Sequence, residues 1–165
     1  FVVQVEKYQS SASPLSGFAS AIRNVVPAEA DSRVHPLVQA WTTSNLHAGQ
    51  FTAACGVTVV EGTWLGKQNG LHVLTCEPTG SLVQARSLFR PADGRGNLKL
   101  QDAPSDREFL ASRDPWFRPV DLVVGPGQDL YVVDMYRAVI EHPEWVPDEL
   151  KHRPDERDGD GCGRI

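Results

Sequence analysis

The sequence predicts an all-β fold, and three observations support that prediction. Short runs rich in β-branched residues, such as residues 51–60 and 130–134, alternate with turns rich in glycine and proline. No stretch of about ten or more residues shows a clear helical period. The 165 residues are 41% hydrophobic and 22% charged, which is a globular composition with enough apolar side chains for a core.

Charge and hydropathy limit the classes of function. The formal net charge is −5 at pH 7, so nothing favours binding to nucleic acid or to anionic membranes. The apolar runs are far shorter than the ~20 residues that span a bilayer, and we expect no transmembrane segment in this piece. The chain begins at Phe1 without an initiator methionine and stops at Ile165, and we expect both ends to be cuts through strands.

The first part of the chain gives weaker signals. Residues 9–20 are small, polar and broken by proline, which predicts a loop or linker. Residues 21–33 have weak helical character that is interrupted at Pro27. Residues 34–46 indicate an extended segment with turns.

Four strands joined by turns are predicted in the middle of the chain, at residues 51–60, 71–78, 81–89 and 98–101. Together they predict an antiparallel meander. The pattern then restarts with strands at 118–124 and 130–134, joined by a five-residue loop rich in glycine and proline. A third strand, a charged insertion and the start of a last strand are expected at residues 137–142, 142–161 and 162–165.

Two successive four-stranded units favour a partial β-propeller with long irregular loops, because propeller blades repeat every ~40–45 residues. The unit starts near Cys55 and Val120 are 65 residues apart, and the excess lies in one long connection at 90–118. A six-bladed propeller needs about 250 residues or more, so we expect about two to three of its blades. The expected divisions are a leader with a partial blade, one blade, and an incomplete next blade, at residues 1–46, 47–112 and 113–165. The alternative is a β-sandwich with irregular loops.

Cys55 and Cys76 are predicted to face each other across two adjacent strands. Placing Val59 opposite His72 in a hairpin also places the two cysteines opposite each other. Directly opposite residues have Cβ atoms roughly 4.5–5.5 Å apart, and a disulfide needs roughly 3.5–4.5 Å. Two alternatives therefore remain open: a disulfide, which implies an oxidising compartment, or two buried free thiols. Cys162 has no visible partner.

Several segments resemble a known family; they read WTTSNLHAGQFTAACGVTVV, CEPTGSLV, REFLASRDPWFRPVDL, LYVVDMYRAVIEHPEW and GRI, at residues 41–60, 76–83, 107–122, 130–145 and 163–165. The chain resembles the large bacterial membrane-bound dehydrogenases of the Planctomycetes–Verrucomicrobia type, which are similar to sorbosone and soluble glucose dehydrogenases. The resemblance implies a β-propeller in an exported or periplasmic protein, membrane-associated in full length. It also implies oxidation of a sugar or alcohol with pyrroloquinoline quinone, with calcium as a further cofactor. A c-type cytochrome domain, outside this piece, would be the electron-transfer partner.

The chain departs from the family pattern at three places, and one of these departures favours a second hypothesis. Residues 81–85 read SLVQA where the family has N-L-V-H-R, the loop 125–129 replaces G-P-D-G-A, and Cys162 stands where the family has arginine. The loss of a basic pair favours a non-catalytic propeller module that binds a glycan or positions a cytochrome domain. In either case we expect the isolated piece to be inactive.

His47 is the candidate catalytic base. It lies in a loop just before a strand that we expect to be innermost, and an imidazole with an ordinary pKa near ~6.5 suits proton abstraction. The alternative is a loop histidine that binds backbone groups. No metal-ligating set is predicted, because no third ligand follows a regular spacing near His142.

Four further residues are candidates for cofactor binding. Arg118 and Trp116 precede a strand, where a guanidinium can clamp the carboxylates of a quinone and an indole can stack on its plane. Asp134 and Tyr136 follow the returning strand. The structural alternatives are an Arg118 that pairs with a nearby aspartate, and an Asp134 that caps a turn through backbone N–H groups.

Overall fold

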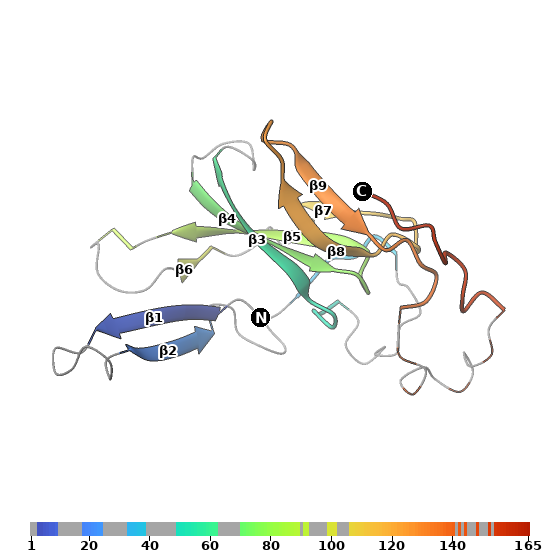
Figure 1. The fold of residues 1–165 in the computed structure, drawn as a ribbon, viewed down its shortest axis with the longest axis horizontal. Coiled ribbons are helices and arrows are strands. Elements are labelled where there is room, and N and C mark those ends of the chain that lie inside the picture. The colour runs from blue at the N-terminus through green and yellow to red at the C-terminus, as the bar shows by residue number, and fades with distance from the viewer. Residues whose placement is uncertain are drawn as a thin grey trace.

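The computed structural model describes part of the chain: residues 3–9, 18–24, 33–38, 49–62, 70–89, 91–92, 99–101, 106–140, 142, 144, 148, 152 and 154–165. These residues are mostly β and form antiparallel sheets, with no α-helix among them (Figure 1). Nothing helical in this described part is long and apolar enough to cross a bilayer. The prediction of a β-rich chain is confirmed at this level.

The central sheet is an antiparallel meander in the order β3-β4-β5-β6, and it confirms the four strands predicted in the middle of the chain. Its strands are β3 (Cys55–Gly62), β4 (Gly70–Glu77), β5 (Leu82–Phe89) and β6 (Lys99–Leu100). The tight turn between β4 and β5 is closed by a 3.2 Å bond from the Ser81 amide to the Pro78 carbonyl. Ser81 has a φ of 53°, a left-handed conformation that is uncommon for residues other than glycine.

The outer edge of β5 is shared by β6 and by β7 (Leu110–Ala111), which the sequence did not predict. Leu88 pairs with Leu100, so in one unbroken strand Val83 would face residue 105, yet it faces Leu110. β6 and β7 therefore pair with the same edge of β5 and are separated by five residues more than one continuous strand would have. The long connection predicted between the two units thus returns to the sheet at β7.

A hairpin of β8 (Pro119–Val124) and β9 (Leu130–Asp134) forms the second unit, and it confirms the two strands and the five-residue loop predicted there. The loop is closed by a 2.8 Å bond from the Gly125 amide to the Asp129 carbonyl. Asp134 also forms an isolated bridge with Arg164, through two backbone bonds of 2.9 Å. The segment predicted to begin a last strand therefore does start to pair with β9.

The strand predicted at 137–142 is wrong for its described residues, which contain no strand. The carbonyls of Arg137 and Ala138 accept bonds from the Arg118 side chain, and the Ala138 amide binds the Asp158 carbonyl at 3.2 Å. These backbone groups thus form hydrogen bonds with Arg118 and Asp158, and not with β9.

At the start of the chain, β1 (Val3–Gln9) and β2 (Phe18–Asn24) pair as an antiparallel hairpin. This corrects the weak helix expected from residue 21 onward for residues 21–24, and it places Gln9 and residues 18–20 in strands rather than in the expected loop. β2 reads FASAIRN, and the apolar residues of such a short segment fit the periodicity of a helix as well as that of a strand. Pairing with a second strand overrides a weak helical propensity.

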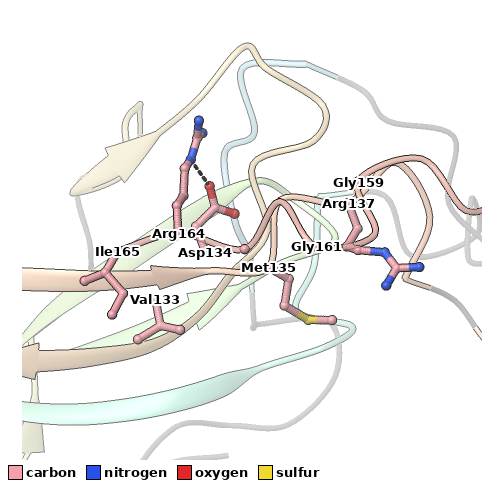
Figure 2. Close-up of a pocket in the computed structure, with 9 residues that line it drawn as sticks. Val133, Asp134, Met135, Arg137, Gly159, Gly161, Arg164 and Ile165 are labelled. Atoms are coloured by element: carbon pink, nitrogen blue, oxygen red, sulfur yellow. Dashed lines mark hydrogen bonds and ion pairs between the residues drawn. The ribbon is translucent and has the colours of Figure 1, made fainter.

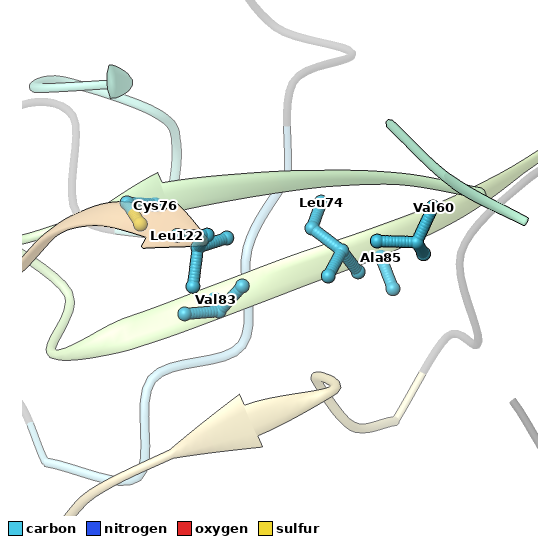
Figure 3. Packing of buried hydrophobic residues seen from close by; sticks show 6 residues of the cluster. All are labelled: Val60, Leu74, Cys76, Val83, Ala85 and Leu122. Atoms are coloured by element: carbon cyan, nitrogen blue, oxygen red, sulfur yellow. The ribbon is translucent and has the colours of Figure 1, made fainter. Parts of the chain in front are cut away.

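The core lies between the central sheet and the β8–β9 hairpin. Its buried members are Val60, Leu74, Cys76, Val83, Ala85 and Leu122 (Figure 3). They come from β3, β4, β5 and β8, so this cluster joins the two units. Burial of each large aliphatic side chain contributes about 1.5–3 kcal/mol.

Strands β3 and β8 approach closely at Gly56. Its φ is 56°, and a Cβ there would lie 2.6 Å from the Val120 carbonyl oxygen, so only glycine fits. Two residues further along, the Thr58 hydroxyl donates a 2.8 Å bond to the Leu122 carbonyl. The first strands of the two units therefore lie side by side.

The register of β3 against β4 was predicted correctly at one end only. Cys55 does face Cys76, as expected. Val59 faces Val73 rather than His72, because a bulge between Cys55 and Thr58 shifts the register by one residue.

Candidate functional site

The side chain of Asp134, at the end of β9, joins three segments of the chain. It is 3% exposed. Its Oδ1 accepts bonds from the backbone N–H groups of Arg118 at 2.7 Å and Tyr136 at 2.9 Å. Its Oδ2 accepts a 2.8 Å bond from Nε of Arg164, and this ion pair raises the pKa of that guanidinium. The carboxylate thus caps backbone N–H groups at the strand end, as expected if Asp134 has a structural role.

Arg118 is 2% exposed, and its guanidinium donates to backbone carbonyls from two directions. On one side it binds the carbonyls of Pro78 at 3.0 Å and Thr79 at 3.5 Å, in the turn between β4 and β5. On the other side it binds those of Arg137 at 3.1 Å and Ala138 at 2.9 Å, after β9. A planar guanidinium with five donors suits this arrangement, and it ties the two units together.

Trp116, Tyr136 and Arg164 form an aromatic and cationic cluster beside Asp134. The two rings meet edge to face, with centroids 5.6 Å apart at an interplanar angle of 63°. The guanidinium carbon of Arg164 lies 3.7 Å from the centroid of the Tyr136 ring, a cation–π contact. A hydrogen bond to Asp114 raises the pKa of the Tyr136 phenol. Tyr136 has a φ of 50°, a conformation that costs a non-glycine residue free energy and here turns the chain away from β9.

An open hollow of about 400 Å³ lies next to this cluster (Figure 2). Its wall includes Asp134, Met135, Arg137 and Arg164 together with the glycine-rich segment 159–163. Arg137 forms a 2.7 Å ion pair with Asp160, while its Nε is buried and has no hydrogen-bond partner. Both arginines on this wall are therefore paired with aspartates.

Glu77, at the end of β4, repeats the arrangement of Asp134. Its carboxylate is fully buried and accepts bonds from the backbone N–H groups of Thr52 and Ala53, each at 3.0 Å, just before β3. It also accepts a backbone bond from Thr79, two residues later. Asp134 likewise binds the N–H group just before β8 and the N–H group two residues later. Burial raises the pKa of Glu77, and these hydrogen bonds partly oppose that rise.

Glu108 forms a separate, partly buried polar cluster that sequence reasoning missed. Its Oε1 accepts a 2.7 Å bond from the His35 backbone N–H and lies 3.5 Å from Nε2 of Gln84. Its Oε2 is buried without a hydrogen-bond partner, and burial raises the pKa of the carboxyl group. Arg86 completes the cluster through a 2.8 Å bond from Nε to Oε1 of Gln84.

Comparison with known proteins gives a family and nothing more specific. The family described as "Domain of unknown function (DUF7133)" matches residues 1–165. The chain belongs to this family. No curated protein and no solved structure matches the chain.

In this DUF7133 chain, the four predicted cofactor-binding residues do come together. Arg118, Trp116, Asp134 and Tyr136 all contact one another or a shared neighbour. His47, the predicted base, lies outside the described residues. Cys55 and Cys76 face each other as free thiols.

Two residues of the polar clusters, Arg164 and Glu108, were not singled out from the sequence. Both lie in segments that carry the family resemblance, which was the one sequence feature that could have pointed to them. Their partners are distant in sequence: Arg164 binds Asp134, and Glu108 binds the backbone of His35. Local spacing therefore could not reveal these contacts.

The predicted clamp residues do not fit a quinone that carries carboxylates. The Arg118 guanidinium is buried and bound to carbonyl oxygens, so it offers no vacant pair of donors. One face of the Tyr136 ring is covered by the Arg164 guanidinium. Within the described residues, no three histidine, cysteine, aspartate or glutamate side chains gather as a metal site.

Proposed function

We propose that the chain supplies successive blades of a β-propeller and acts there as a non-catalytic scaffold or binding module. The observation that carries this proposal is the Arg118 guanidinium, which is bound to four backbone carbonyls between the two units. A side chain used in this way fixes one blade against the next. It is not available to a ligand.

The repeated capping by Glu77 and Asp134 supports the propeller architecture. Each carboxylate ends the second strand of its unit and binds the backbone just before the first strand of that unit. Propellers are built from such repeated antiparallel units around a common axis. The close approach of β3 and β8 at Gly56 suits two innermost strands of neighbouring blades.

A quinone-dependent sugar or alcohol dehydrogenase is the second candidate function. The resemblance to sorbosone and soluble glucose dehydrogenases favours it, and so does the aromatic pair of Trp116 and Tyr136. In that case His47 would be the base, pyrroloquinoline quinone the cofactor and calcium a further ion. An exported or periplasmic location, a sugar or alcohol substrate and a c-type cytochrome partner belong to the same proposal.

Calorimetric titration of the full-length protein that contains this chain, with pyrroloquinoline quinone in the presence of calcium, separates the two functions. The scaffold proposal predicts no saturable heat and no dye reduction across a panel of sugars that includes glucose and sorbosone. A saturable binding curve together with sugar-dependent dye reduction would favour the dehydrogenase.

A pair of variants assigns any quinone binding to the cluster. Trp116→Ala removes the indole, and Arg107→Gln changes an arginine whose side chain is 79% exposed and pairs with Asp106 at 3.9 Å. Binding that is lost in Trp116→Ala and kept in Arg107→Gln would contradict the scaffold proposal. Binding that is equal in both variants would lie outside the cluster.

A further inference from the structure

Two cysteines from neighbouring strands occupy directly opposed positions in the central sheet. Cys55 is the first residue of β3, and it pairs with Cys76, near the end of β4. Directly opposed residues on antiparallel strands have Cβ atoms roughly 4.5–5.5 Å apart, slightly more than the roughly 3.5–4.5 Å of a disulfide. The small difference has to be taken up by the backbone.

The backbone at Cys55 is suited to that adjustment. A bulge separates Cys55 from Thr58, and Gly56 inside it has a φ of 56°. A bulge leaves a residue outside the regular ladder and lets its strand bend locally. The bulged backbone can therefore move and bring Cys55 closer to Cys76.

We propose that Cys55 and Cys76 form a cross-strand disulfide while the chain folds, and that the folded core then shields it. The structure represents the dithiol form, with all three cysteines free. The proposal is independent of the proposed function, because it concerns the joining of β3 to β4 and no ligand.

The chemistry is thiol–disulfide exchange with glutathione disulfide as the oxidant. The Cys55 thiolate attacks one sulfur of glutathione disulfide, breaks its S–S bond and releases one glutathione. The Cys76 thiolate then attacks Sγ of Cys55, breaks the mixed disulfide and releases a second glutathione. Two protein thiols are oxidised, one glutathione disulfide is reduced, and the two protons end on the two released glutathiones.

Burial explains why the bond should form before the core closes. Cys76 is fully buried against Leu122 and Val83 (Figure 3), and only Cys55 is partly accessible. Burial raises the pKa of the Cys76 thiol to about 12 and also raises that of Cys55. Since the thiolate is the reacting species, the folded dithiol should react slowly and the unfolded chain quickly.

The test follows disulfide formation in the Cys162→Ser chain, which lacks the exposed third thiol. The reduced, unfolded chain is diluted into a buffer of glutathione and glutathione disulfide, quenched with iodoacetamide and digested with trypsin without reduction. The proposal predicts that the peptides 34–67 and 68–86 are recovered as one linked mass. Recovery of separate peptides that carry alkyl groups or glutathione would overturn it.

A second arm treats the folded, reduced chain with the same buffer. The proposal predicts at least tenfold slower linkage than in the refolding chain, and equal rates would contradict the shielding. The Cys55→Ser variant in the same background is the matched control and should give no linked mass. The wild-type chain can be digested in the same way, so the result does not depend on the folding of any variant. In the wild-type digest, peptide 158–164 should carry the alkyl group on Cys162.

Discussion

Three buried polar side chains, Glu77, Arg118 and Asp134, bind mainly backbone groups in this chain. Each lies where a strand begins or ends, and each satisfies N–H or carbonyl groups that leave the ladders there. Buried polar groups cost free energy unless they are hydrogen-bonded, so these contacts offset the burial of their own charges. Arg118 and Asp134, which were chosen from the sequence as cofactor ligands, thus hold the loops in place.

Replacement of Arg118 by lysine should destabilise the fold by about 3 kcal/mol, because an ammonium group cannot reach carbonyls on both sides. Urea unfolding measures the change. The matched control is Arg107→Lys, whose side chain is 79% exposed and should change stability by less than about 0.5 kcal/mol. Equal stabilities of the two variants would show that the Arg118 bonds contribute little.

Replacement of Glu108 by glutamine should remove a pH-dependent loss of stability. Burial raises the pKa of Glu108 in the folded state above its ordinary value of 4.5, so the carboxyl group favours folding when protonated. The wild-type chain therefore loses this stability as pH rises from the unfolded value through the folded value. Glutamine keeps the acceptor for the His35 amide and carries no charge.

Thermal midpoints at pH 4 and pH 7 test this expectation. Relative to wild type, Glu108→Gln should gain stability at pH 7 and little at pH 4, whereas Glu156→Gln, at an exposed position, should change neither. A Glu108→Gln chain that is less stable than wild type at pH 7 would mean that the ionised carboxylate supports the fold.

The strands illustrate what local pattern predicts and what it does not. Residues 130–134 were predicted as a strand and form β9, because their apolar and β-branched residues lie between clear turn signals. The bulge after Cys55 was not predicted, since it depends on how closely β8 approaches Gly56. β7 is two residues long and pairs with β5 only after an excursion, so no periodicity marks it.

Gly56→Ala tests the contact between β3 and β8. Alanine is strained at a φ of 56°, and its Cβ would meet the Val120 carbonyl oxygen at 2.6 Å. We expect a loss of at least about 2 kcal/mol in urea unfolding. Gly70→Ala is the matched control, because nothing lies within 4 Å of its Cβ, and it should be neutral or slightly stabilising. A neutral Gly56→Ala would imply that the two units do not approach as closely in solution.

At the scale of the whole molecule, two β units are joined by a shared core and by one guanidinium. The core cluster draws members from both units, and Arg118 spans the turn after β4 and the segment after β9. The central meander and the β8–β9 hairpin could be predicted from the sequence because each of their strands carries its own local signal. The contacts that join the two units could not, because their partners lie up to 64 residues apart and depend on the packed arrangement.

The most direct test of the central claim is an experimental structure of the protein that contains this chain. The account predicts that β3 and β8 are the innermost strands of adjacent blades around one axis, with Glu77 and Asp134 at the same end of their blades. A closed sandwich, in which the central sheet and the β8–β9 hairpin face each other with no repeated blade beside them, would contradict it.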